Sequence, residues 1–320
     1  MKTKLLMLFI VTILFYIEAG AQNTGEKFRV VGYVMGNLDE LGASIDFSRI
    51  THLNIAFINP DSAGVFKDVP GLKTVVTKAH KNGVKVLMAI AGGRAPAYYR
   101  TLVSPARRTL FIANISKFMK DNQLDGVDVD IEGELITNDY EGFVKELALA
   151  IKPGKLVTAA VATEYGNHLS DIALAQFDFI NIMSYDKTGP WQPQDPGQHA
   201  PYVMAVSDLD YWKIERKIDG TRLNLGVPFY GYSFGLSGAG SQTYKGIIEK
   251  NADAKENDEL PTADGGMIFY NGVSTIKMKT RLALERTGGI MIWQLFQDAT
   301  DANSLLRLIN NEIRALDSKK

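Results

Sequence analysis

Short apolar runs alternate with amphipathic segments along most of the chain. The apolar runs are rich in β-branched and aromatic residues, as is typical of buried strands, and cover 28–34, 50–58, 84–91, 124–132, 156–162, 177–185, 223–228 and 289–295. Between them, apolar residues recur at helical spacing over 39–48, 72–82, 106–121, 138–151, a short segment near 171, 201–218, 276–286 and 301–316. Eight strands alternating with eight helices predict an α/β fold, a (β/α)8 TIM barrel.

A doubly wound open sheet shows a similar alternation, but it usually carries a glycine-rich loop after its first strand. Residues 31–36, VGYVMG, do not fit the pattern GxGxxG, which favours the barrel. One connection, from Pro228 to the helix at Ile276, is long at about forty residues. We predict a single domain with a short excursion between strands seven and eight and no full α+β insertion module. Because residues 251–259 are mostly polar, we expect a loop with at most a short hairpin or helical turn, and a cleft open on that side.

The N-terminus reads as a targeting segment. Lys2 and Lys4 precede an apolar stretch over 5–17, and Ala19 and Ala21 place small residues at the −3 and −1 positions of a cleavage site. This predicts a signal peptide over 1–21, cleavage after Ala21, a catalytic barrel over 22–320 and a secreted or periplasmic protein. An uncleaved membrane anchor is the alternative. No later stretch is apolar enough to cross a membrane, so we expect no membrane association after cleavage.

Composition narrows the choice of partners. The chain is 46% hydrophobic and 22% charged with a net charge of −1, which is ordinary for a globular domain and gives no reason to expect a nucleic-acid partner. It has no cysteine, so the domain depends on its hydrophobic core and not on disulfides. The four histidines are scattered, which argues against a histidine-rich metal centre. We expect a monomer without cofactor or metal, with His199 in a loop and Trp212 in the core.

The stretch 124–132, LDGVDVDIE, carries the candidate chemistry. Apolar residues alternate with Asp128, Asp130 and Glu132, so a strand here has one apolar face and one row of carboxylates about 6.6–7 Å apart. Three carboxylates this close do not all ionise cheaply, so at least one holds a proton near neutral pH. A protonated acid beside an ionised one suits general acid catalysis on a glycosidic oxygen. A solvated acidic edge strand and a divalent-metal site are the alternatives.

These residues also carry a family resemblance. Asp125-Gly126-x-Asp128-x-Asp130-x-Glu132 matches the signature DGxDxDxE, and the chain resembles glycoside hydrolase family 18, the chitinase-like enzymes. Three further stretches agree: 183–186 matches its MxYD motif, 189–201 resembles its cleft loop, and 288–293 resembles its last strand, whose tryptophan floors the sugar pocket. Gly92-Gly93 resembles the end of its SxGG motif, with Ile90 at the serine position. The resemblance places that residue below the carboxylates, so its loss is expected to retune them.

Aromatic and polar residues at the strand ends fit a sugar-binding cleft, because sugar C–H faces stack on rings and hydroxyls need fixed partners. The predicted substrate-binding residues are Tyr33, Phe57, Gly93, Met183, Asp186, Trp191 and Trp293. For Trp191, which follows a Gly-Pro turn, an exposed stacking role is preferred to burial.

The resemblance implies retaining hydrolysis assisted by the substrate. Glu132 would protonate the scissile oxygen and later act as base towards water. Asp130 would orient the 2-acetamido group that attacks the anomeric carbon, Asp128 would lie below and modulate its charge, and Tyr185 would bond to the acetamido carbonyl. Asp186 would bind nearby polar groups.

The implied partner is a polysaccharide or oligosaccharide that contains N-acetylglucosamine. Three functions stay open: a chitinase, an endo-β-N-acetylglucosaminidase acting on N-glycans, and a non-catalytic sugar-binding protein. The MxYD and GxW motifs favour the first, and the presence of Glu132 disfavours the third.

Overall fold

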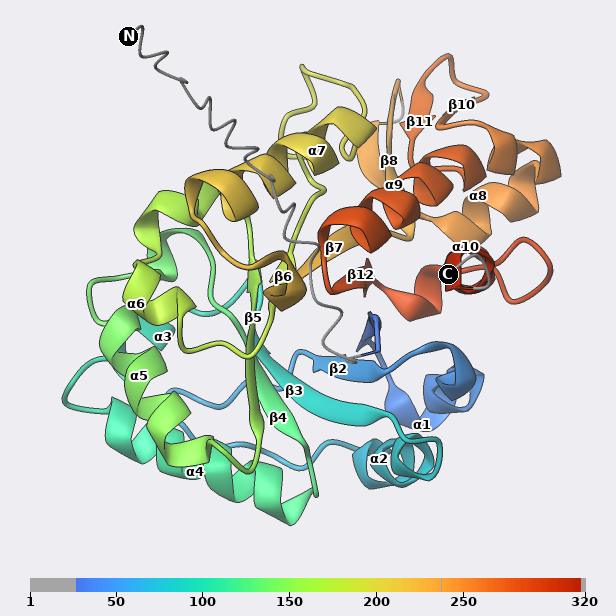
Figure 1. Ribbon diagram of the computed structural model, residues 1–320. Helices are drawn as coiled ribbons and strands as arrows, with labels where there is room; N and C mark the ends of the chain where they lie inside the picture. The colour runs from blue at the N-terminus through green and yellow to red at the C-terminus, as the bar shows by residue number, and fades with distance from the viewer. Residues whose placement is uncertain (1–26, 237, 318–320) are drawn as a thin grey trace, which may run out of the picture.

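The computed structural model describes residues 27–236 and 238–317, and its centre is a closed barrel of eight parallel strands (Figure 1). In chain order these are β1 (Arg29–Met35), β2 (His52–Ala56), β3 (Lys85–Ala91), β4 (Gly126–Asp130), β5 (Leu156–Val161), β6 (Ile180–Ile182), β7 (Leu223–Pro228) and β12 (Gly289–Trp293). Each strand pairs with its neighbour in sequence, and β12 closes the barrel against β1. The predicted (β/α)8 TIM barrel is confirmed. The predicted signal peptide lies outside the described residues.

Helices surround the barrel. They are α1 (Leu38–Leu41), α2 (Leu72–Lys81), α3 (Tyr99–Leu102), α4 (Arg108–Asp121), α5 (Tyr140–Ile151), α6 (Asp171–Leu174), α7 (Tyr202–Asp210), α9 (Val273–Arg286) and α10 (Leu305–Asp317), with α8 (Tyr244–Lys250) in the excursion described below. Among the helices of the described residues, none has the length and apolarity to cross a bilayer.

Two predicted helices are shorter than expected. The helix predicted over 39–48 breaks into α1 and two 3₁₀ turns, the second at Phe47–Arg49. Asp46 precedes that second turn, and its side chain accepts from the backbone N–H of Ser48, a local bond that competes with helix formation. The helix predicted over 201–218 ends at Asp210 and continues as a π-helical turn, Tyr211–Glu215.

The two faces of β4 carry different chemistry. Val127 and Val129 point outward into the core between barrel and helices, whereas Asp128 points into the barrel, where side chains of other strands meet it. All five residues of β4 are buried, and the strand lies between β3 and β5. The alternative of a solvated edge strand is therefore wrong.

The connection between β7 and α9 is more ordered than predicted. It forms a four-stranded antiparallel sheet in the order β10-β11-β8-β9, joined by α8 (Figure 1, orange). Its strands are β8 (Tyr230–Gly235), β9 (Gly238–Thr243), β10 (Glu259–Pro261) and β11 (Met267–Phe269). The prediction of a loop with at most a short hairpin or helical turn is wrong.

This excursion folds because the barrel supplies the core that it lacks. Tyr244 and Ile247 of α8 are fully buried in the main core, and Ile268 of β11 joins them. On the other face, Tyr230 and Tyr232 of β8 pack with residues that point into the barrel. The open cleft was expected because this segment was predicted to be a loop. Since the segment forms a sheet, that reason no longer holds.

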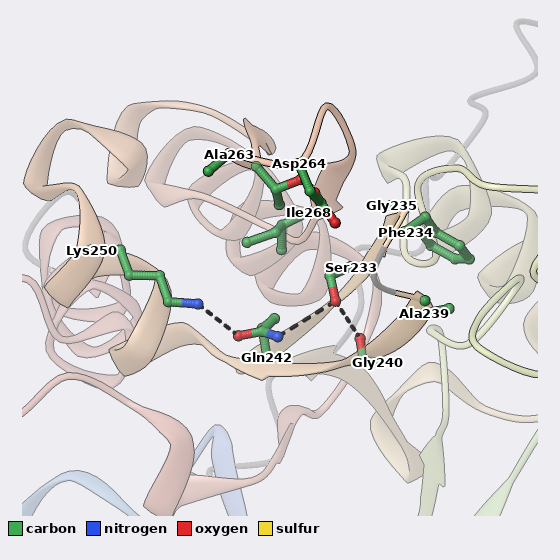
Figure 2. Close-up of a pocket in the computed structure, with 12 residues that line it drawn as sticks. Ser233, Phe234, Gly235, Ala239, Gly240, Gln242, Lys250, Ala263, Asp264 and Ile268 are labelled. Atoms are coloured by element: carbon green, nitrogen blue, oxygen red, sulfur yellow. Dashed lines mark hydrogen bonds between the residues drawn. The ribbon is translucent and has the colours of Figure 1, made fainter.

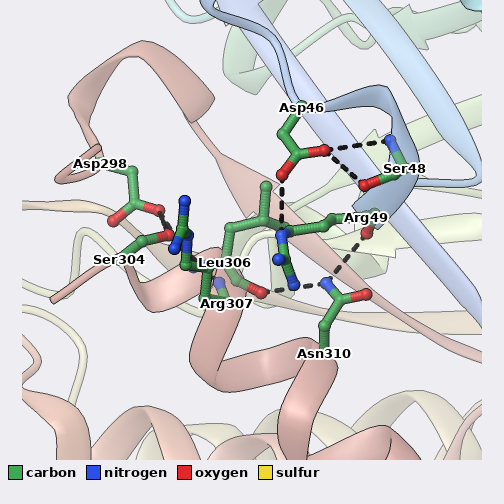
Figure 3. Close-up of polar contacts among 8 residues, drawn as sticks. All are labelled: Asp46, Ser48, Arg49, Asp298, Ser304, Leu306, Arg307 and Asn310. Carbon is green, nitrogen blue, oxygen red and sulfur yellow. Dashed lines mark hydrogen bonds and ion pairs between the residues drawn. The ribbon is translucent and has the colours of Figure 1, made fainter. Parts of the chain in front are cut away.

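The last helix locks the barrel closure (Figure 3). Asp298 accepts hydrogen bonds from the backbone N–H groups of Leu305 and Leu306, at 2.9 and 3.0 Å, and thereby caps the start of α10. One turn later along the helix, Asn310 donates to the carbonyl of Arg49, 3.0 Å away. The contact ties the end of the described chain to the turn before β2.

Candidate active site

The acidic row consists of Asp128, Asp130 and Glu132, with Asp128 at its lower end, inside the barrel. Side chains of three other strands bind Asp128. Asp128 is fully buried, and its Oδ2 accepts from the hydroxyl of Tyr33 on β1 at 2.5 Å. Its Oδ1 accepts from Thr158 on β5 at 2.5 Å and from the amide of Asn181 on β6 at 3.2 Å. Burial raises the pKa of Asp128 to about 6, and these donors hold it from rising further.

The upper two carboxyls have few partners. Asp130 is 3% exposed, and its Oδ1 has no hydrogen-bond partner among the described residues. Its carboxyl and that of Glu132, which follows the end of β4, lie close enough to share a hydrogen bond. Burial, with the charges of Glu132 and Asp128, raises the pKa of Asp130 well above its ordinary value. Burial also raises the pKa of Glu132 to about 7, with a smaller increase from Asp186. The pair therefore holds a proton near neutral pH.

Other residues of the signature shape the strand and do no chemistry at this end. Asp125 lies at the opposite end of β4, where its Oδ2 accepts from the backbone N–H of Val86 and faces Nε2 of His80, both at 2.8 Å. Gly126 lets β4 approach β5, since a Cβ there would meet the carbonyl oxygen of Leu156 at 2.4 Å.

The position assigned to the family serine needs a correction. Ile90 points outward and packs in the core between barrel and helices, away from the carboxylates. The residue that pairs with Asp128 and shares its inward face is Ala89. Because side chains alternate along a strand, an assignment displaced by one residue moves to the opposite face. The side chain under the acidic row on β3 is therefore a methyl group without a donor.

A second polar cluster lies after β6. Asp186 has a left-handed backbone with φ of 64°, and its Oδ1 accepts from the hydroxyls of Tyr230 and Tyr232, the latter at 3.0 Å. His199 is in a loop as predicted, but it is fully buried, with Nδ1 3.4 Å from the same oxygen. Tyr185 is 8% exposed, and its hydroxyl donates to the sulfur of Met291 at 3.7 Å. The fixed hydroxyls hold Asp186 in a conformation that few side chains adopt.

Three aromatic rings, those of Trp293, Phe57 and Tyr33, form a further cluster. Trp293 is partly buried and stacks on Phe57, with ring centroids 5.6 Å apart and planes at 28°. It also contacts the ring of Tyr33, which is 1% exposed and lies beneath it. Gly93 leaves the acid uncovered, since a Cβ there would lie 3.2 Å from Oε1 of Glu132.

The remaining predicted residues are placed as follows. Trp191 is 56% exposed and meets Tyr232 edge to face, at 5.5 Å between ring centroids. Met183 is partly buried against the residues inside the barrel. Trp212 is fully buried in the core, as predicted, and donates to Thr163.

Sequence reasoning missed several residues that meet the predicted ones. They are Thr158, Asn181, His199, Tyr230 and Tyr232. The signal for Asn181 and Thr158 was a lone polar residue in an apolar strand, at a position that alternation places inside the barrel.

Two hollows lie outside this constellation. One, of about 490 Å³, is on the face of the excursion sheet opposite Tyr232, where Lys250, Gln242 and Ser233 form a row of hydrogen bonds (Figure 2). The other, of about 480 Å³, lies between the loops that follow β4 and β5 and is lined by Thr137 and His168, among others. Across the described ranges, no cluster of three or more His, Cys, Asp or Glu residues is arranged to hold a metal ion.

Comparison with known proteins assigns a family. The model of glycosyl hydrolases family 18 matches residues 15–298. The GH18 chitinase ChiB from the chitin utilization locus of Flavobacterium johnsoniae is 39% identical, with a TM-score of 0.84 over 91% of this chain and 95% of that one. A chitinase from Bacteroides thetaiotaomicron is 30% identical, with a TM-score of 0.79 over 90% of this chain and 97% of that one.

A chitinase-like effector of Moniliophthora roreri is 30% identical over 227 residues, which are 60% of this chain. The match spans 55% of that effector's length.

Proposed function

Because the chain belongs to glycosyl hydrolases family 18, we propose that it cleaves β-1,4 bonds in polymers or oligomers of N-acetylglucosamine. The observation that carries this proposal is the acidic row. Glu132 stands at the mouth of the barrel with a pKa raised to about 7, beside a second carboxyl that shares its proton. A carboxylic acid that is still protonated near neutral pH is what a glycosidic leaving group needs.

The proposed reaction is retaining and assisted by the substrate. Glu132 donates its proton to the scissile oxygen while the 2-acetamido oxygen attacks the anomeric carbon. Asp130 carries an Oδ1 without a protein partner, which is available to accept from the acetamido N–H. Its negative charge then stabilises the positive oxazolinium ring, and Glu132 removes a proton from the incoming water. Tyr185 is proposed to donate to the acetamido oxygen in place of its weak bond to Met291.

The substrate is proposed to lie over Trp293, with its apolar face on the indole and its hydroxyls near Asp186. Stacking on an aromatic ring suits the C–H face of a pyranose. Chitin is favoured over N-glycans because Flavobacterium johnsoniae ChiB, 39% identical, belongs to a chitin utilization locus.

We further propose that the protein is exported and acts as a monomer outside the cytoplasm. The predicted signal peptide supports this, with its basic start, its apolar stretch over 5–17 and small residues before Gln22. N-terminal sequencing of the protein recovered from its natural compartment tests the cleavage after Ala21, and light scattering tests the monomer.

The function is tested by product analysis. The purified protein is incubated with N-acetylglucosamine oligomers and, separately, with a high-mannose glycoprotein, and the Glu132→Gln variant serves as the control. We expect shorter oligomers that first appear as β-anomers by NMR, and no glycan release. Glycan release without oligomer cleavage would indicate the endo-β-N-acetylglucosaminidase. Tight oligomer binding with no cleavage of either substrate would indicate a non-catalytic sugar-binding protein.

A further inference from the structure

A line of polar side chains runs through the barrel interior beneath the acidic row. It starts at Arg29, at the first residue of β1, whose Nε donates to Oδ1 of Asn224 on β7 at 3.0 Å. Nδ2 of Asn224 donates to Oδ1 of Asn181 on β6 at 2.8 Å. Nδ2 of Asn181 reaches Oδ1 of Asp128 at 3.2 Å and the hydroxyl oxygen of Tyr33 at 3.0 Å.

The two ends of this line fix the orientation of both amides. A guanidinium has donors only, so the atom of Asn224 that faces Arg29 is its oxygen. Its NH₂ group is then left for Asn181, whose oxygen must face it. The NH₂ group of Asn181 is therefore directed at the carboxylate of Asp128. Each amide therefore directs its NH₂ group along the line towards Asp128. The guanidinium of Arg29, which is always charged, lies at the other end.

Burial makes the line electrostatically important. Asn181, Asn224 and Asp128 are all fully buried, and in such surroundings a fixed donor acts on a charge far more strongly than in water. Arg29 is also held by a hydrogen bond to the carbonyl of Thr221 and by the ring of Phe179, 4.9 Å from its guanidinium carbon. None of its neighbours in the line is free to turn.

We infer that Arg29, Asn224 and Asn181 form a positioning relay that keeps Asp128 ionised and fixed, so that the exchangeable proton of the acidic row stays on Asp130 and Glu132. None of the three relay residues touches substrate in this assignment. They act through Asp128, whose negative charge in turn favours a proton on the pair formed by Asp130 and Glu132 above it.

The surroundings of Asp128 contain other groups that affect its charge. Acidic groups near it are Asp130 on its own strand and Tyr33, Tyr140 and Tyr185, from β1, α5 and the end of β6. The uncharged groups that face it are Asn54 from β2, Ala89 from β3 and Thr158 from β5. Within the described part of the chain, the relay links Asp128 to a cation through an unbroken series of hydrogen bonds.

The sharpest test is Asn224→Asp, which conserves shape but reverses the polarity of the relay. An aspartate at 224 still pairs with Arg29, but it has no N–H for Asn181. The amide of Asn181 is then expected to turn, so that it donates to position 224 and presents its oxygen to Asp128. Asp128 loses a donor and gains a nearby acceptor, and both changes raise its pKa, by about one unit.

The readout is a carboxyl ¹³C NMR titration of protein labelled at aspartate, with the Asp128 signal assigned through Asp128→Asn. This measurement does not depend on turnover, so it separates the relay from the proposed function. If the protein also hydrolyses chitin oligomers, which rests on the proposed function, the acid limb of kcat/KM should move to higher pH by a similar amount. An unchanged Asp128 titration in a folded Asn224→Asp variant would overturn the relay.

Two further variants guard the test. Arg29→Met keeps the packing on Phe179 but removes the cation, and it should shift the Asp128 titration in the same direction by a smaller amount; it serves if Asn224→Asp does not fold. Asn122→Ala removes a buried amide at the end of α4, which donates to the carbonyl of Phe118. This control should lower Tm without moving the titration. An equal shift in the control would show that the effect is general loosening and would reject the relay.

Discussion

Asp128 and Asp130 are two residues apart on one strand, point the same way and are almost equally buried, but their surroundings differ. Asp128 accepts from Tyr33, Thr158 and Asn181, and its pKa rises only to about 6. Asp130 has a carboxyl oxygen with no partner among the described residues, and its pKa rises well above the ordinary value. Both carboxyl oxygens at the lower end of the row have donors, whereas at the upper end Oδ1 of Asp130 has none among the described residues.

The difference shows how one row of identical groups performs two tasks. Donors at the lower end hold a charge in place, while their absence at the upper end leaves Asp130 and Glu132 with a proton and with unused hydrogen-bonding capacity. A buried polar atom without a partner costs free energy in the absence of a ligand. The unsatisfied end is the end where a substrate is proposed to bind.

The largest effect should come from removing the acid at the open end. Glu132→Gln keeps the shape of the side chain but has no proton to transfer, so kcat on chitin oligomers should fall by about 10²–10⁴-fold or more. Oligomer affinity, measured by calorimetry, should stay close to that of the unmodified protein. Turnover that survives in the purified variant would assign the acid to another group.

The same substitution at the two aspartates should change stability in opposite directions. Because burial raises the pKa of Asp130 well above its ordinary value, this carboxyl costs folding free energy at about pH 7.5, where the unfolded chain would ionise it freely. Asp130→Asn removes that cost and should raise Tm by about 2–4 °C. Asp128→Asn keeps one acceptor oxygen and puts an NH₂ group in place of the other, so either Thr158 or Tyr33 loses its acceptor and Tm should fall by a similar amount. Calorimetry of both variants measures the contrast. Shifts of the same sign would show that the donors around Asp128 do not compensate for its burial.

The raised pKa values also set a pH dependence. A carboxyl whose pKa is higher in the folded than in the unfolded protein stabilises the fold below its ordinary pKa, and this contribution is lost as pH rises. The free energy of unfolding should therefore decline between about pH 4 and the folded values of about 6 for Asp128 and about 7 for Glu132.

Activity should peak below neutral pH and fall as Glu132 deprotonates. Rates that still rise above about pH 9 would contradict this assignment.

The smallest effect should come from adding a donor where the lower end lacks one. Ala89→Ser places a hydroxyl on β3 beside Asp128, whose Oδ2 already accepts from the hydroxyl of Tyr33. The acid limb of kcat/KM should move down by about half a pH unit. Ile90→Val, which shortens an outward-facing side chain, is the matched control and should leave the profile unchanged. A shift in the control alone would return the supporting role to position 90.

The barrel and the acidic row were predictable because their signals are local. Alternation over 124–132 is contained in nine consecutive residues, and it gave the face of Asp128 and Asp130 correctly. The partners of Asp128 were not predictable in the same way. Thr158 and Asn181 lie on different strands, and their meeting depends on the register and stagger of the closed barrel. The sequence records each of them only as one polar residue in an apolar run.

Two errors have equally physical origins. Ile90 was placed beneath the carboxylates because a motif was matched one residue out of register, and in a strand this exchanges inside for outside. The excursion was expected to be a loop because residues 251–259 are mostly polar and offer little apolar surface for an independent core. Tyr244 and Tyr230 pack their rings against the barrel instead. These contacts join residues far apart in the sequence, so local sequence patterns do not reveal them.

Because the three tryptophans are buried to different extents, the intrinsic fluorescence of the protein can report sugar binding. Trp212 is fully buried away from the site and provides a constant emission, whereas Trp191 is 56% exposed and Trp293 is partly exposed above Phe57. A sugar stacked on either indole would displace water from it and shift its fluorescence to shorter wavelength. Binding can therefore be followed in the Glu132→Gln variant without a label, and Trp191→Phe and Trp293→Phe separate the contributions of the loop and the barrel to the signal.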